Sequence, residues 1–198
     1  MISGRNCGSC TVCCTVKAIA SAELIKAPGL DCPHCDKSGC IIYETRPDPC
    51  RAYRCVYLTT DLFADRARPD RSGVLVDIDA EPPPKGYAHI ATIQPFRDPA
   101  RVLAPPYPEL VARLIGAGCS VYLSGAGPPG TLNAIALLNG MFDEAAAAGD
   151  LKAVRAGLEH TLARIAAHAF IPFSVADAQA RVAEDARRRG SPETRRYP

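Results

Sequence analysis

The pattern of hydrophobic and polar positions becomes regular only in the middle of the chain. Two strand-like runs, GVLVDID at 73–79 and YAHIATIQPF at 87–96, are joined by the turn-rich segment AEPPPKG. The segment at 104–118 has helical spacing, with Pro108 suited to its first turn and glycines at its end. SVYLS at 120–124 reads as a short strand. The pattern therefore predicts the order strand, strand, helix, strand.

The C-terminal third is predicted to be mostly helical. Apolar residues recur at helical spacing in 131–149 and again in 151–170. In the second segment one stripe is formed by Leu151, Val154, Leu158, Leu162 and Ile165. Ser174 is a candidate N-cap for a last helix, and we expect residues 186–198 to be a disordered tail.

The first sixty residues lack this regularity. A short helix is predicted within 16–30, with Pro28 and Gly29 as its stop, and a helical turn is predicted within 46–55. A segment of this kind buries little apolar surface, so we expect a bound metal to staple it.

These patterns predict an α+β fold class. An irregular, cysteine-rich, metal-stapled N-terminal module at 1–60 packs on a small sheet with several helices. A charged connector at 61–72 leads to an α+β body at 73–185, whose C-terminal part is helical.

The distribution of cysteines is the strongest organisational signal. Nine of the ten lie between Cys7 and Cys55, and only Cys119 stands apart. The N-terminal residues show no apolar run typical of a secretory signal, and no stretch approaches roughly eighteen apolar residues, so no membrane span is expected. We therefore expect a cytoplasmic protein. In that reducing compartment, dense cysteines indicate metal binding or catalysis rather than disulfides.

Composition limits the classes of binding partner that we expect for this protein. The formal net charge is +2, tryptophan is absent, and other aromatic residues are few. Neither charge nor stacking side chains indicate a nucleic-acid partner. The expected partner is a metal ion or cluster, and the sequence indicates no membrane partner and identifies no protein partner.

The clustered cysteines have the spacing of metal ligands. The candidates are Cys7, Cys10, Cys13, Cys14, Cys32, Cys35, Cys40, Cys50 and Cys55. A C-x2-C turn points two thiols at a common centre, and four thiolates complete a structural zinc site or hold an iron–sulfur cluster. Thiolates suit both cofactors, so spacing leaves zinc and iron–sulfur equally open. The nine cysteines could fill two four-ligand sites with one left over, or serve one site and leave several uncommitted.

The adjacent pair Cys13 and Cys14 constrains the arrangement. On a helix their side chains would point about 100° apart, and in an extended segment they would point to opposite faces. We infer that one of the two belongs to a different site or has a reactive function.

Cations near the cysteines are candidate donors to sulfur, because four thiolates around a metal leave a net negative charge. The candidates are Lys17, Arg46, Arg51 and Arg54. The alternative is a solvated charged surface. His34, inside CPHC, could replace a thiolate, although a bystander on the turn is the simpler interpretation.

Two stretches together resemble a known family. CGSCTVCC at 7–14 and GCIIYETRPDPCRAYRC at 39–55 are similar to the motifs of the CxxCxxCC (YkgJ-type) family of zinc- or iron-chelating cysteine cluster proteins. In the second stretch the matching positions are Cys40, Tyr43, Arg46, Pro47, Cys50 and Arg51. The resemblance covers about a quarter of the chain. It implies a chelated metal, with zinc or an iron–sulfur cluster as the expected species, and no settled activity.

Three functional hypotheses follow. The first is a metal-binding protein whose thiolate site is structural or redox-active. The second is an iron–sulfur-dependent enzyme of group transfer, such as protein methylation, or of redox chemistry, since some larger members of the family resemble flagellin lysine methylases. The third is a chelator that stores or passes on metal.

Weaker signals occur in the body. GAGPPG at 125–130 fits G-x-G-x-x-G, but its two prolines remove backbone donors, so a turn is the better interpretation than a dinucleotide site. Asp77 and Asp79 share a strand face and could do acid–base work, although the wet side of an edge strand is the usual explanation.

The remaining isolated residues are assigned to packing. His89, His160 and His168 have no motif around them. Cys119 is expected to be a small apolar core residue.

Overall fold

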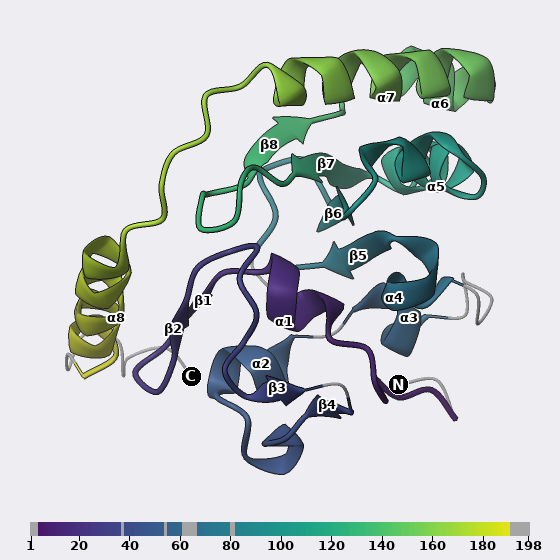
Figure 1. Ribbon diagram of the computed structural model, residues 1–198. Helices are drawn as coiled ribbons and strands as arrows, with labels where there is room; N and C mark the ends of the chain where they lie inside the picture. Colours follow the sequence, from purple (N-terminus) through teal and green to yellow (C-terminus); the bar gives the residue numbers. More distant parts are fainter. Residues whose placement is uncertain (1–3, 37, 54, 61–66, 80–81, 191–198) are drawn as a thin grey trace.

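The computed structural model describes residues 4–36, 38–53, 55–60, 67–79 and 82–190. Residues 189 and 190 are described in backbone only. The described chain has an α+β architecture (Figure 1). Its strands are β1 (Ile19–Ala20), β2 (Ile25–Lys26), β3 (Cys35–Asp36), β4 (Gly39–Cys40), β5 (Val74–Ile78), β6 (His89–Pro95), β7 (Cys119–Gly125) and β8 (Ala134–Leu137). Its helices are α1 (Val12–Val16), α2 (Asp48–Ala52), α3 (Val56–Thr59), α4 (Pro69–Ser72), α5 (Tyr107–Gly116), α6 (Asp143–Ala148), α7 (Leu151–Ala166) and α8 (Val175–Gly190), with 3-10 segments η1 (Tyr43–Thr45) and η3 (Pro99–Leu103).

A four-stranded sheet in the order β5-β6-β7-β8 organises the body. The β6–β7 pair is parallel, and the other two pairs are antiparallel. The parallel pair is joined through η3 and α5, because parallel strands need a crossover connection. The predicted order of strand, strand, helix and strand is therefore confirmed.

The main core lies between one face of this sheet and the helices α5 and α7. Val121 and Leu123 of β7 are fully buried there. On α7 the predicted stripe is largely confirmed: Val154, Leu158 and Ile165 are buried. Leu151, at the start of the helix, is exposed instead.

The helical prediction for 131–149 is wrong in its first half. Residues 134–137 form β8, and only the segment from Asp143 is helical. Ala134 and Ala136 face the core while Ile135 and Leu137 are exposed, which is the period of a strand. Pairing with β7 supplies the hydrogen bonds, and a short apolar run fits either structure until its partner is known.

The helix predicted within 16–30 is also wrong. The segment forms the β1–β2 hairpin, in which Ile19 pairs with Lys26. An isolated helix of this length is marginal in water, and the hairpin is held by long-range contacts instead. One of these joins the Gly29 amide to the Thr15 carbonyl at 2.9 Å.

The N-terminal module packs on the face of β5 opposite the main core. Leu75 lies in a second apolar cluster with Val12 and Val16 of α1. In Figure 1 the module and its short hairpins lie below β5, while α7 lies above the sheet and α5 lies to the right of β7. Cys10, Cys13 and Cys55, which pack against this cluster, are thus held against the edge strand of the body.

The C-terminal helix α8 packs against the β1–β2 hairpin (Figure 1). Ser174 caps it as predicted, since its hydroxyl accepts a hydrogen bond from the Asp177 amide at 3.1 Å. The helix extends to Gly190, into the segment predicted to be a tail, and 191–198 lie outside the described residues. No helix in the described ranges is long and apolar enough to cross a membrane.

Candidate metal centre

The structure gathers all nine candidate cysteines in the N-terminal module. They come from the loop before α1 (Cys7, Cys10), from α1 itself (Cys13, Cys14), from the turn and hairpin at β3 and β4 (Cys32, Cys35, Cys40), from α2 (Cys50) and from the residue before α3 (Cys55). Each of the ten cysteines of the chain carries a thiol that is not in a disulfide. The residues selected by sequence spacing therefore lie within one module.

Two of the three C-x2-C segments, 7–10 and 32–35, form tight turns. The Cys10 amide donates to the Cys7 carbonyl at 2.9 Å, and the Cys35 amide donates to the Cys32 carbonyl at 3.0 Å. Turns of this kind are the backbone geometry by which a C-x2-C spacing can direct two thiols at one centre.

A glycine lets the β3–β4 hairpin approach the first of these turns closely. Cys35 and Cys40 are partners across the β3–β4 hairpin, and Gly39 sits between them at φ 126°. A Cβ at Gly39 would lie 2.6 Å from the carbonyl oxygen of Gly8, in the first turn. The hairpin can approach the first turn this closely only because residue 39 has no side chain.

The doublet Cys13–Cys14 lies at the junction of the cysteines. The predicted divergence of the pair is only partly right, because the Cys13 thiol donates a hydrogen bond to the Cys14 sulfur. Their other neighbours differ. Cys13 interacts electrostatically with Cys7 and Cys10, whereas Cys14 also accepts a hydrogen bond from Cys35.

The cysteines accordingly form two groups. The Cys13 group contains Cys7, Cys10, Cys13 and Cys55, and the Cys14 group contains Cys14, Cys32, Cys35, Cys40 and Cys50. In the first, Cys55 interacts with Cys7 and Cys10. In the second, Cys50 interacts with Cys14, Cys32 and Cys40.

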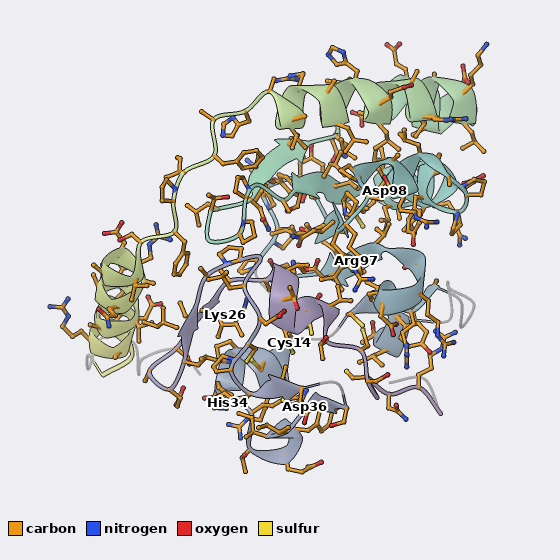
Figure 2. All side chains as sticks on the ribbon, in the orientation of Figure 1. Cys14, Lys26, His34, Asp36, Arg97 and Asp98 are labelled. Carbon is orange, nitrogen blue, oxygen red and sulfur yellow. The ribbon has the colours of Figure 1, made fainter. Side chains whose placement is uncertain are left out.

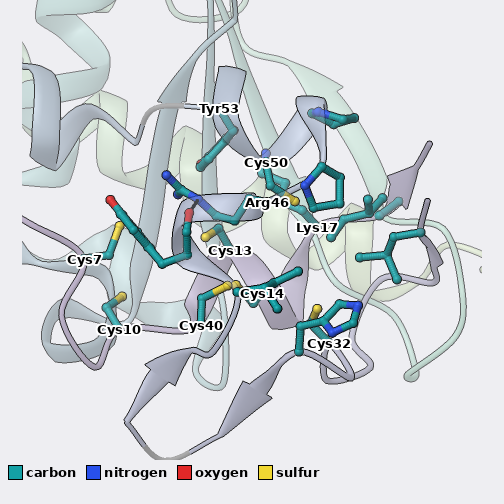
Figure 3. A pocket seen from close by; sticks show the side chains of 18 of the residues that line it. Cys7, Cys10, Cys13, Cys14, Lys17, Cys32, Cys40, Arg46, Cys50 and Tyr53 are labelled. Carbon is teal, nitrogen blue, oxygen red and sulfur yellow. Dashed lines mark hydrogen bonds between the residues drawn. The ribbon is translucent and has the colours of Figure 1, made fainter. Parts of the chain in front are cut away.

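A cavity of about 440 Å³ runs along both groups. Figure 3 shows Cys7 and Cys10 at one end of it and Cys32 at the other, with Cys13, Cys14 and Cys40 between. A second cavity, of about 190 Å³, is lined by the whole Cys13 group and by Cys50. Within the described ranges, no three Cys, His, Asp or Glu side chains converge closely enough to hold a metal ion as they stand. Metal binding would therefore require the thiols to close into these cavities.

The pKa of Cys14 differs from those of its neighbours. Hydrogen bonds from Cys13 and then Cys35 outweigh burial, and with the charges of Lys26 and Arg46 they lower its pKa to about 6. Donation to Cys14 raises the pKa of Cys13 well above its usual range. Cys14 is thus favoured to act as a thiolate near neutral pH.

Burial is the main influence on the pKa of several other thiols of the module. It raises the pKa of Cys10 and Cys50, and it raises that of Cys55 to about 11. A metal binds the thiolate, so loading these positions would release protons.

Lys26 is a site residue that sequence reasoning missed. Its ammonium is buried and donates to the carbonyls of Thr15, Ala27 and Leu30 at 2.7–3.0 Å. Burial lowers its pKa, while Cys32 and Cys14 oppose that shift. Figure 2 places Lys26 and Cys14 in the same part of the module. A lone lysine in an apolar stretch carries no motif, so spacing gave no signal for it.

The cations predicted to surround the site have separate roles. Arg46 stacks on the Tyr43 ring at 3.6 Å and lines the larger cavity. Arg51 is exposed and pairs with Asp48. Lys17 lines the cavity but pairs with a carboxylate, and Arg54 lies outside the described residues.

Asp77 departs from the expectation of a solvated edge-strand carboxylate. It lies on the edge strand β5 but is only 8% exposed, because the module covers it. The Lys17 ammonium lies 2.8 Å from its Oδ2. Burial raises the pKa of Asp77, and Lys17 acts in the opposite direction. Asp77 therefore joins module to body, and it also lines the larger cavity.

Of the other weaker candidates, one more lies at this site. His34 lines the larger cavity, in the turn between Cys32 and Cys35. Cys119 is buried in the main core, as predicted. GAGPPG precedes a strand rather than a helix, so the phosphate-binding strand–turn–helix unit is not formed there.

The isolated histidines His89, His160 and His168 line neither of the two cavities. His89 is exposed at the start of β6. His168 packs edge-on against Phe170, with the ring centroids 5.9 Å apart.

Comparison with family models, curated proteins and solved structures finds no match for this chain. The resemblance to the CxxCxxCC family stays a prediction that rests on the two motifs.

Proposed function

We propose that the N-terminal module binds metal through cysteine thiolates, as zinc or as an iron–sulfur cluster. The observation that carries this proposal is the gathering of nine thiols in one module, from sequence positions as far apart as Cys7 and Cys55. Eight of them line two shared cavities. Nine thiols in one module far exceed what packing alone would use, since a buried cysteine serves as an ordinary small apolar residue.

The donor set suits either species. Thiolates bind zinc tetrahedrally and hold iron–sulfur clusters, and the nearby cations Lys26 and Arg46 offset the negative charge that four thiolates leave. The short hairpins and turns of the module bury little apolar surface between them, so a bound metal would also stabilise their fold.

Metal analysis of protein purified without oxygen, together with a visible spectrum, tests this proposal. Stoichiometric zinc in a colourless protein, or iron and sulfide in a brown one, would support it and identify the species. A Cys10→Ser variant should lose bound metal and destabilise residues 4–60, and Cys119→Ala serves as the control with an unchanged module. Protein that holds neither metal, when prepared with both supplied, would contradict the proposal.

A second candidate is an enzyme that uses an iron–sulfur cluster. The observation in its favour is that the larger cavity extends beyond the thiols to the Lys17–Asp77 pair and to Tyr53. Its volume of about 440 Å³ lies within the range of small-ligand pockets. When bound, a cluster would supply electron transfer, while the chain's own residues would position a ligand and exchange protons at Asp77. Iron–sulfur content with a spectrum that changes on adding a small-molecule ligand would favour this candidate over a structural zinc site.

A further inference from the structure

The two groups of cysteines differ in what they pack against. Cys10, Cys13 and Cys55 surround the apolar cluster of Val12, Val16 and Leu75. Cys55 also forms a β-bridge with Asp77 on the edge strand. The Cys13 group is therefore anchored to the body of the protein.

The Cys14 group is anchored to a different support. Cys35 and Cys40 lie on the β3–β4 hairpin, and Cys50 lies on α2. The neighbouring ammonium of Lys26 holds the loops of this half through carbonyl groups at both ends of the β1–β2 hairpin. Among the described residues, those that pack on the apolar cluster at β5 include no member of the Cys14 group.

We infer that the module holds two metal centres, one on each group, and that the peptide between Cys13 and Cys14 joins them. This inference rests on the proposed metal-binding function. The Cys13 group supplies four thiolates, which is the complement of a closed four-coordinate site. The Cys14 group supplies five, one more than such a site requires.

The doublet explains how one short helix serves both centres. Adjacent helical residues diverge, so a single turn of α1 directs Cys13 toward Cys7 and Cys10, and Cys14 toward Cys35. The contact between the two sulfurs places the centres next to each other rather than at opposite ends of the module.

Zinc stoichiometry in group-specific variants tests the division. The reduced full-length chain is loaded with zinc alone, freed of loosely bound ion, and assayed for zinc per chain. The wild type should hold about two zinc ions. Cys7→Ser/Cys55→Ser and Cys35→Ser/Cys40→Ser/Cys50→Ser each leave two thiols in one group, and each should halve the zinc content. Cys119→Ala should leave it unchanged.

A measurement on the wild type guards against variants that fail to fold. Limiting zinc is added, remaining thiols are alkylated, and intact chains are sequenced by mass spectrometry. Chains with one ion should protect thiols of a single group, either Cys7 with Cys55 or Cys40 with Cys50.

The outcomes separate the two proposals. One zinc ion per chain, with protected thiols drawn from both groups, would overturn the division and leave the metal-binding function standing. A wild type that retains no zinc and no iron would overturn both.

Discussion

At the scale of single residues, charge and hydrogen bonding decide what each cysteine can do. Cys14 and Cys50 share one group, yet the pKa of Cys14 is lowered and that of Cys50 is raised. The difference arises because Cys14 accepts hydrogen bonds from two thiols, whereas burial dominates at Cys50. Metal loading at Cys50 should therefore depend more steeply on pH than loading at Cys14.

Lys26 offers a test at this scale. Lys26→Met removes the donor to three carbonyls, so we expect the free energy of unfolding of the metal-free, reduced protein to fall by about 1–3 kcal/mol. Denaturant unfolding measures the change. Lys152→Met, on the exposed face of α7, is the matched control and should alter stability by less than about 0.5 kcal/mol. Equal stabilities of the two variants would show that the buried ammonium contributes nothing.

At the scale of elements, short hairpins and turns position the cysteines of the module, whereas long helices form the core of the body. The β3–β4 hairpin has only two residues per strand, but it presents Cys35 and Cys40 and contacts the first C-x2-C turn at Gly8. Its position depends on the backbone of Gly39 rather than on burial of side chains.

Gly39→Ala tests this dependence. A side chain at φ 126° costs about 1–3 kcal/mol, and its Cβ would also press on the Gly8 carbonyl, so both stability and zinc affinity should fall. Gly86→Ala is the control, because it has φ 96° but no atom within 4 Å of the new Cβ. We expect the control to lose stability without losing zinc affinity. Zinc affinity is measured by competition with a chelator, and equal affinities in the two variants would count against the contact.

At the scale of the whole molecule, the module is coupled to the body through one face of β5. Leu75 packs on α1, and Asp77 pairs with Lys17, while the other face of the same strand belongs to the main core. Because alternate residues of a strand point to opposite faces, one strand supports both halves of the protein.

A pair of leucine substitutions tests this coupling. Leu75→Ala and Leu123→Ala each empty a fully buried position and should each reduce the free energy of unfolding by about 2–5 kcal/mol. Only Leu75→Ala should weaken zinc binding and raise hydrogen exchange in residues 10–16, because Leu123 belongs to the main core. The comparison is made at a temperature where both variants are folded. A loss of zinc affinity in Leu123→Ala as large as that in Leu75→Ala would show that the module and the whole body act as a single unit.

The α+β class and the strand, strand, helix, strand order were predictable because each of these elements carries its own period. β8 and the β1–β2 hairpin were not, since a short apolar run becomes a strand only when a partner is present to satisfy its backbone. Lys26 was missed for a similar reason: its carbonyl partners are assembled by the fold.

The sequence by itself determined the supply of thiols and the two C-x2-C turns, because a turn closes through a hydrogen bond between residues three apart. Only the tertiary structure decided which thiols meet. Cys55 reaches Cys7 and Cys10, and Cys50 reaches Cys14, through packing of segments that are remote along the chain. Spacing carries no information about such contacts, since they depend on how α1 and α3 lie against β5.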